Sequence, residues 1–61
     1  MFVRISTAEA LRADVVDAVP EMERVTETVL SGELVDRAAL SRVLATLRRL
    51  RARVVSVDVA P

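Results

Sequence analysis

The sequence predicts a small α+β fold of the ferredoxin-like plait type, with two helices on one face of a three- or four-stranded sheet. Three observations predict this class. β-Branched residues alternate along residues 2–6 and 54–59, and residues 37–51 have the apolar spacing of an amphipathic helix. The predicted order, β-α-β-(β)-α-β, is that of a split βαβ unit. Because no linker, repeat or low-complexity stretch interrupts it, residues 1–61 are expected to form a single α+β domain.

Residues 2–6 predict the first strand, because β-branched side chains and period-two alternation are typical of a half-buried strand. Val3 and Ile5 would point to one face of the sheet. Phe2 and Arg4 would point to the other.

A helix is expected directly after this strand. Ser6 is followed three residues later by Glu9, which matches the capping box that begins many helices. The apolar stripe of this helix is expected to contain Leu11, Val15, Ala18 and Val19. Pro20 would end it, because proline disfavours a helical conformation in the residue before it.

Residues 22–35 predict extended structure of one of two kinds. Ser31-Gly32 is the only glycine-containing turn signal in the chain. It would form either a tight hairpin between two strands or a bulge within one long strand. The sequence leaves both alternatives open.

The second helix is the most strongly predicted element. Asp36 is a favourable N-cap, and the following residues to Arg51 repeat apolar side chains at intervals of three and four. The stripe consists of Leu40, Val43, Leu44, Leu47 and Leu50.

A last strand is expected over residues 54–59. Strict alternation would place Val55, Val57 and Val59 on one face, and Val54, Ser56 and Asp58 on the other.

Composition excludes most catalytic chemistry. The chain has no His, Cys, Lys, Asn, Gln, Trp or Tyr. It therefore lacks an imidazole base, a thiolate, a Schiff-base amine and the usual zinc ligands. The carboxylates Asp14, Asp17, Glu21 and Glu23 match no metal-binding loop, and we expect them to be solvated. We predict a non-enzymatic protein with no catalytic residues, no cofactor and no bound metal.

Small size and high apolar content together predict self-association. The chain has 61 residues and is 52% hydrophobic, yet a domain of this size has little interior. A plait leaves one sheet face bare, so we expect a homodimer or higher oligomer that forms through that face. The predicted interface centres on Phe2, Arg4, Val54 and Ser56. Another protein is a further possible partner.

Arginines in the second half give the alternative function. Residues 1–36 hold eight acids and three arginines, whereas residues 37–61 hold six arginines and one acid. Guanidinium groups bind phosphates bidentately, so a small nucleic-acid-binding regulator is the competing hypothesis. Its anion-binding residues would be Arg42, Arg48, Arg49, Arg51 and Arg53. The simpler interpretation is a solvated helix end, where cations complement the helix dipole.

The expected location is the cytoplasm, with no membrane partner. No signal-peptide pattern is visible, and no apolar run approaches the roughly 18 residues that span a bilayer.

Residues 28–40 read Thr-Val-Leu-Ser-Gly-Glu-Leu-Val-Asp-Arg-Ala-Ala-Leu. This segment resembles one shared by short uncharacterised proteins of actinobacteria, with the pattern T-x-L-[ST]-G-x-L-x-D-x-A-A-L. The resemblance implies a bacterial protein with a strand, a capped helix and a terminal strand, and it implies no activity. The chain departs from that pattern at Arg37, Ser41 and Arg42, where Gln, His and Gly are usual.

Overall fold

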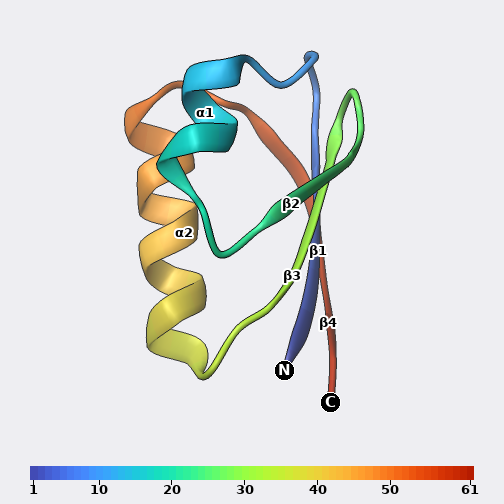
Figure 1. Ribbon diagram of the computed structural model, residues 1–61, viewed down its shortest axis with the longest axis vertical. Helices are drawn as coiled ribbons and strands as arrows, with labels where there is room; N and C mark the ends of the chain where they lie inside the picture. Colours follow the sequence, from blue (N-terminus) through green and yellow to red (C-terminus); the bar gives the residue numbers. More distant parts are fainter.

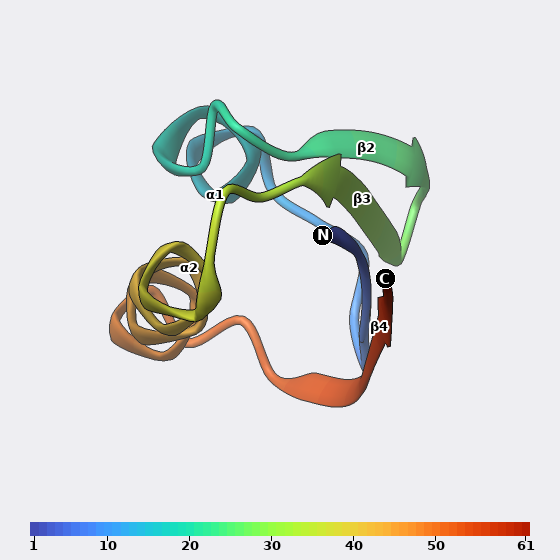
Figure 2. The ribbon, with the colours of Figure 1, turned by 90° about the horizontal axis from the view of Figure 1, so that it is seen from below.

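The computed structural model describes all of residues 1–61 as a small α+β fold with two helices and a four-stranded antiparallel sheet. The elements in chain order are β1 (Phe2–Thr7), α1 (Ala13–Ala18), β2 (Glu23–Thr26), β3 (Val29–Glu33), α2 (Arg37–Arg49) and β4 (Val54–Ala60). Figure 1 shows these elements with the sheet seen nearly edge-on and the helices beside it. The sheet order is β2-β3-β1-β4, so β1 and β3 are central and β2 and β4 are the edges (Figure 2). Figure 2 shows both helices on the same side of the curved sheet.

The core lies between the sheet and the two helices. It consists of eleven buried residues, none of them aromatic. They are Val3, Ile5, Leu11, Val15, Val19, Met22, Leu30, Leu34, Ala39, Val43 and Leu47. The opposite face of the sheet has no covering layer (Figure 2).

The strand β1 confirms the predicted alternation. Val3 and Ile5 are fully buried, whereas Phe2 and Arg4 are exposed. The strand runs one residue further than predicted, to Thr7, whose hydroxyl is buried and donates to the carbonyl oxygen of Glu9 at 2.8 Å.

The predicted capping box is wrong. Ser6 lies within β1, paired with Val29 and Ser56, so it cannot cap a helix. An irregular segment follows, and α1 begins only after the N-cap residue Arg12. Val15 and Val19 are buried as predicted, but Ala18 is exposed, because a helix this short presents only a narrow stripe to the core.

Residues 22–35 form a hairpin, but not at the predicted position. The turn is Glu27-Thr28, and Ser31-Gly32 lies inside β3. Gly32 pairs with Val3 of β1 and therefore belongs to the core-facing row of the sheet. A Cβ at this position would lie 2.6 Å from the carbonyl oxygen of Glu21. Gly32 is thus needed where the connection between α1 and β2 crosses the sheet, rather than in a turn.

The helix α2 confirms its prediction at the N-terminus. The Asp36 carboxylate accepts a hydrogen bond from the backbone N–H of Ala39 at 2.9 Å, so Asp36 is the N-cap. Val43 and Leu47 are buried, and the flanking leucines are half-buried.

The C-terminal end of α2 is a Schellman motif, in which two N–H groups beyond the helix satisfy its last carbonyls. The N–H of Arg51 donates to the carbonyl oxygen of Arg48 at 3.0 Å, and that of Ala52 donates to Leu47 at 2.9 Å. Arg51 has φ 62°, a left-handed conformation that usually belongs to glycine.

The strand β4 departs from strict alternation. A register shift separates the pair Ser6–Ser56 from the pair Thr7–Val54. Val54 therefore lies opposite the buried Thr7 and packs against the core, whereas Ser56 faces the bare side of the sheet.

Candidate interaction site at the edge strand β4

The strand β4 has one edge without a partner strand. Its other edge pairs with β1, and no element follows it in the sheet order. The strand has seven residues, and Val55, Val57 and Val59 are 65%, 36% and 53% exposed. A long, apolar, unpaired edge is a template for pairing with another strand, and monomeric proteins usually protect such edges with charges, proline or a covering element.

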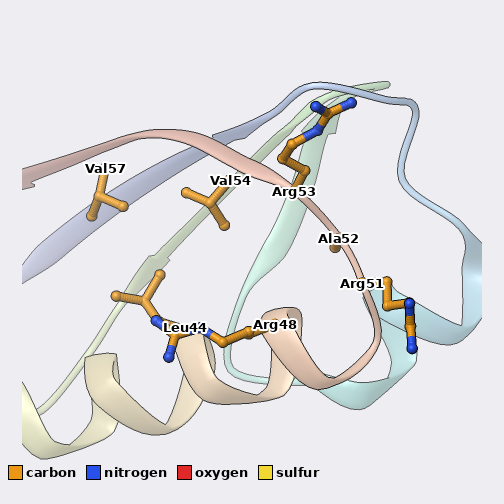
Figure 3. Close-up of a pocket in the computed structure, with 7 residues that line it drawn as sticks. All are labelled: Leu44, Arg48, Arg51, Ala52, Arg53, Val54 and Val57. Atoms are coloured by element: carbon orange, nitrogen blue, oxygen red, sulfur yellow. The ribbon is translucent and has the colours of Figure 1, made fainter.

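A groove runs beside this edge, between β4 and α2. Its volume is about 470 Å³, and its apolar lining consists of Leu44, Ala52, Val54 and Val57. Figure 3 shows Val54 and Val57 pointing from β4 toward α2, where Leu44 projects toward them. Val57 lies opposite the fully buried Ile5, so it belongs to the core-facing row of the sheet.

Three arginines complete the lining of the groove: Arg48, Arg51 and Arg53, hereafter the arginine rim. In Figure 3 the Arg48 side chain extends toward Leu44, whereas those of Arg51 and Arg53 point away from the groove. Arg53 donates to the Glu9 carboxylate at 2.7 Å, whereas Arg48 and Arg51 form no ion pair. No acidic side chain lines the groove. Arg48 therefore offers a cationic donor beside the apolar floor, with Arg51 at the end of the groove, an arrangement suited to a partner with both acidic and apolar side chains.

The arginines of the alternative hypothesis are divided by the structure. Arg48, Arg51 and Arg53 all line the groove, with side chains that point in different directions (Figure 3). Arg42 and Arg49 are exposed on α2 and do not line the groove.

The predicted interface residues are also divided. Phe2, Arg4 and Ser56 do lie on the bare face of the sheet, opposite Ala60, Asp58 and Ser6 respectively on the neighbouring strand. Val54 does not, because the register shift turns it toward α2, where it lines the groove. On this face β1 contributes Phe2, Arg4 and Ser6, and Phe2 is the only large hydrophobic residue among them. The bare face is therefore mainly polar.

The opposite edge of the sheet is acidic. Glu23 belongs to β2, and Glu21 and Glu27 lie in the turns on either side of it; these three residues are hereafter the acidic edge. All three are exposed, and none forms an ion pair. Arg24 is the only basic residue of β2.

Nearby, Asp14 of α1 is paired with Arg12. The guanidinium Nε donates to the carboxylate at 3.0 Å. This hydrogen bond is the main cause that lowers the pKa of Asp14, and the same bond raises the pKa of Arg12. Arg12 also donates from Nη2 to the carbonyl oxygen of Leu50 at 2.6 Å, so it links the start of α1 to the end of α2.

The carboxylates gather into no metal site. No group of three or more carboxylates in the structure is arranged to hold a metal ion. Asp14 and Asp17 of α1 are exposed, as are Glu21 and Glu23. In addition, no helix has the length and apolar character that crossing a membrane requires.

The sequence interpretation missed the groove and assigned Val54 to the wrong face. The valines of β4 indicate a strand in the sequence. The bulge that reorients Val54 depends instead on how β4 meets the end of β1, which the valines do not indicate. Three of the five predicted anion-binding residues, Arg48, Arg51 and Arg53, line the groove, and anion binding by them stays a prediction.

Comparison with known proteins gives one finding beyond the geometry. No curated protein and no solved structure shows significant similarity to the chain. Residues 2–58 match a family described as a domain of unknown function, DUF8691, and the match covers nearly the whole chain. The protein therefore belongs to the DUF8691 family.

Proposed function

We propose that this protein is a non-enzymatic interaction module that associates with itself, and that its interface is the edge of β4. The observation that carries the proposal is the unpaired seven-residue strand with three exposed valines beside an apolar groove. Strand addition to such an edge forms main-chain hydrogen bonds, while the neighbouring side chains give specificity. This interface replaces the bare face, whose exposed residues are mainly polar.

We also infer that the fold is a ferredoxin-like plait. The element order β-α-β-β-α-β and the strand order β2-β3-β1-β4 support this assignment. The position of both helices on one side of the sheet agrees with it (Figure 2). In such an architecture β4 is an edge strand that remains available to a second molecule.

The absence of suitable chemistry supports the non-enzymatic assignment. The groove is lined by aliphatic side chains and arginines and holds no general base. The hydroxyls of Thr26, Thr28 and Ser31 have no imidazole or amine to activate them, since the chain contains no His and no Lys.

Sedimentation velocity at two protein concentrations tests the proposed interface. The chain mass is 6.7 kDa, so a dimer is clearly resolved from a monomer. Val59→Lys and Val55→Lys place a charge on the β4 edge and are expected to give monomers. Val35→Lys is the matched control, because Val35 is 84% exposed and lies between β3 and α2.

Phe2→Glu distinguishes the two candidate interfaces. Phe2 lies on the bare face, so this variant is expected to keep the wild-type assembly if β4 is the interface. Loss of assembly in Phe2→Glu, with retention in Val59→Lys, would place the interface on the bare face. A wild-type protein that sediments as a monomer at both concentrations would overturn self-association altogether.

Nucleic-acid binding is the second candidate, and one observation favours it. Residues 37–57 contain six arginines and no acid, so α2 and the start of β4 form a basic side of the molecule. Binding to phosphates would weaken steeply with salt, because each contact releases condensed counterions. Arg48→Ala combined with Arg49→Ala would weaken it further. Binding that is insensitive to both changes would reject this function.

A further inference from the structure

Charged groups of opposite sign lie beside the two free edges of the sheet, although the only charged residue within β4 itself is Asp58. The β4 edge adjoins the arginine rim, and the other free edge, β2, carries the acidic edge. Arg48 and Arg51 lack an ion-pair partner within the chain, as do Glu21, Glu23 and Glu27. Each edge thus presents charges that only another molecule can pair.

We propose that the β4 edge of one copy binds the β2 edge of the next copy, so that the arginine rim meets Glu27 of the acidic edge head to tail. This inference rests on the self-association proposed above and specifies which surface of the second copy occupies β4. Complementary charge gives such a contact its register and orientation.

The strand directions favour this arrangement. The strand β1 is antiparallel to both β3 and β4, and β2 is antiparallel to β3. Directions therefore alternate across the whole sheet, and β4 runs opposite to β2. A second copy in the same orientation would place its β2 antiparallel beside β4, so the sheet continues without a break in the pattern. The helices of both copies then lie on the same face.

Of the acidic edge, Glu27 lies at the height of the arginine rim, whereas Glu23 is level with Ser31, Arg4 and Asp58 and lies toward the other end of the sheet. The carbonyl of Arg53 accepts from Ala8 and that of Thr28 accepts from Thr7, so both residues lie at the same end of β1. Glu27, which adjoins Thr28, accepts from Leu11 through its own carbonyl. A copy in the same orientation therefore brings Glu27 level with the Arg51–Arg53 end of β4.

The helix layer adds a further complementary contact. Continuing the sheet places α1 of the second copy next to α2 of the first. The helix α2 has no acidic residue, whereas α1 carries Asp14 and Asp17. Asp14 is occupied by Arg12, so Asp17 remains available to the arginine rim.

A head-to-tail contact leaves one free edge at each end of the assembly. If successive copies close on themselves, these two edges pair and the assembly is a ring. Otherwise it is an open chain whose mass grows with concentration, and neither assembly is a closed dimer. Salt is expected to reduce the mass, because the contact pairs exposed charges. An isologous β4–β4 dimer would instead bring the two basic sides together, and salt would not weaken it in this way.

Charge exchange tests the pairing directly. Arg51→Glu and Glu27→Arg each place like charges in contact and are expected to weaken association about tenfold at low salt. The double variant Arg51→Glu/Glu27→Arg restores opposite charges between copies and is expected to regain most of the wild-type mass. Arg42→Glu is the matched control, because Arg42 is an exposed arginine of α2 outside the groove. Circular dichroism establishes that each variant is folded.

The outcomes separate this inference from the proposed function. Recovery in the double variant supports head-to-tail pairing. If Glu27→Arg has no effect while Val59→Lys gives a monomer, β4 is an interface but the acidic edge is not its partner, and the head-to-tail proposal is overturned. A double variant that is no better than Arg51→Glu alone would overturn it as well. Loss of association in Arg42→Glu would show a general charge effect and would also reject the specific pairing.

Discussion

Gly32 and Glu21 are in such close contact that a Cβ on Gly32 would lie 2.6 Å from the Glu21 carbonyl oxygen. The Sδ atom of Met22 would be 2.9 Å away. Because the closest atom belongs to the backbone, a side-chain rotation cannot relieve the contact. The connection between α1 and β2 therefore crosses the sheet at the one position where a strand residue has no side chain.

Gly32→Ala is expected to destabilise the fold by about 1–3 kcal/mol, because the added methyl must displace backbone in a packed region. The free energy of unfolding in urea measures this loss. Ser31→Ala is the control, since Ser31 is the preceding residue of β3 and lies opposite the exposed Arg4. Equal stability of Gly32→Ala and the wild type would show that the connection moves freely.

Arginine-to-glycine substitutions two residues apart are expected to have opposite effects. Arg51 has φ 62°, so Arg51→Gly relieves a strained conformation and should stabilise the protein by about 1 kcal/mol. Arg49 is in the last turn of α2, where Arg49→Gly should cost about 1 kcal/mol.

Thermal unfolding of the two glycine variants measures both effects. A loss of stability in Arg51→Gly would mean that the Arg51 side chain makes a stabilising contact that outweighs the backbone strain. If Arg51→Gly is more stable yet associates less, the arginine is retained for binding rather than for folding.

The pair Arg12–Asp14 predicts a measurable pH effect. Hydrogen bonding to Arg12 holds the pKa of Asp14 below its ordinary value of 3.8. Because the folded-state pKa is the lower one, the pair stabilises the fold above the unfolded-state pKa. That contribution is lost as the pH falls through the folded-state pKa.

Arg12→Ala is expected to raise the pKa of Asp14 toward its ordinary value, as followed by NMR titration of the side-chain carboxyl carbon. Arg4→Ala is the control, because Arg4 lies on the bare face of the sheet. An unchanged Asp14 titration in Arg12→Ala would show that the pair does not form in solution.

Elements that depend on local chemistry were predictable from the sequence. Asp36 caps α2 through its own carboxylate, and Val43 and Leu47 follow the helical repeat into the core. The alternation of Val3 and Ile5 likewise identified the buried face of β1. In each case the interaction lies within the element that the pattern predicts.

Features that depend on distant segments were not predictable. The backbone of Thr7 bonds to Thr28 and that of Ala8 bonds to Arg53, so the chain after Ser6 is held extended where the capping box predicted a helix. The hairpin turns at Glu27-Thr28, which contains no glycine. Gly32 is needed elsewhere, for a contact with Glu21 that only the tertiary fold creates.

The groove could not be predicted from the sequence, because it too depends on contacts between distant segments. Its lining comes from α2, β4 and the segment between them, and its apolar floor includes Val54 only because β4 has a bulge where it meets Thr7. The spacing of valines along one strand contains no information about that junction.

The position of β1 between β3 and β4 has a consequence for synthesis. Phe2 pairs with Ala60, so β1 is synthesised well before its partner strand β4. Until β4 has left the ribosome, one edge of β1 remains open and the apolar face that includes Val3 and Ile5 is incompletely covered. The sheet is therefore completed only after β4 has emerged, through contacts between residues far apart in the chain. During that interval the nascent chain offers a second vacant strand position, next to β1, at which chaperones or neighbouring chains compete with β4.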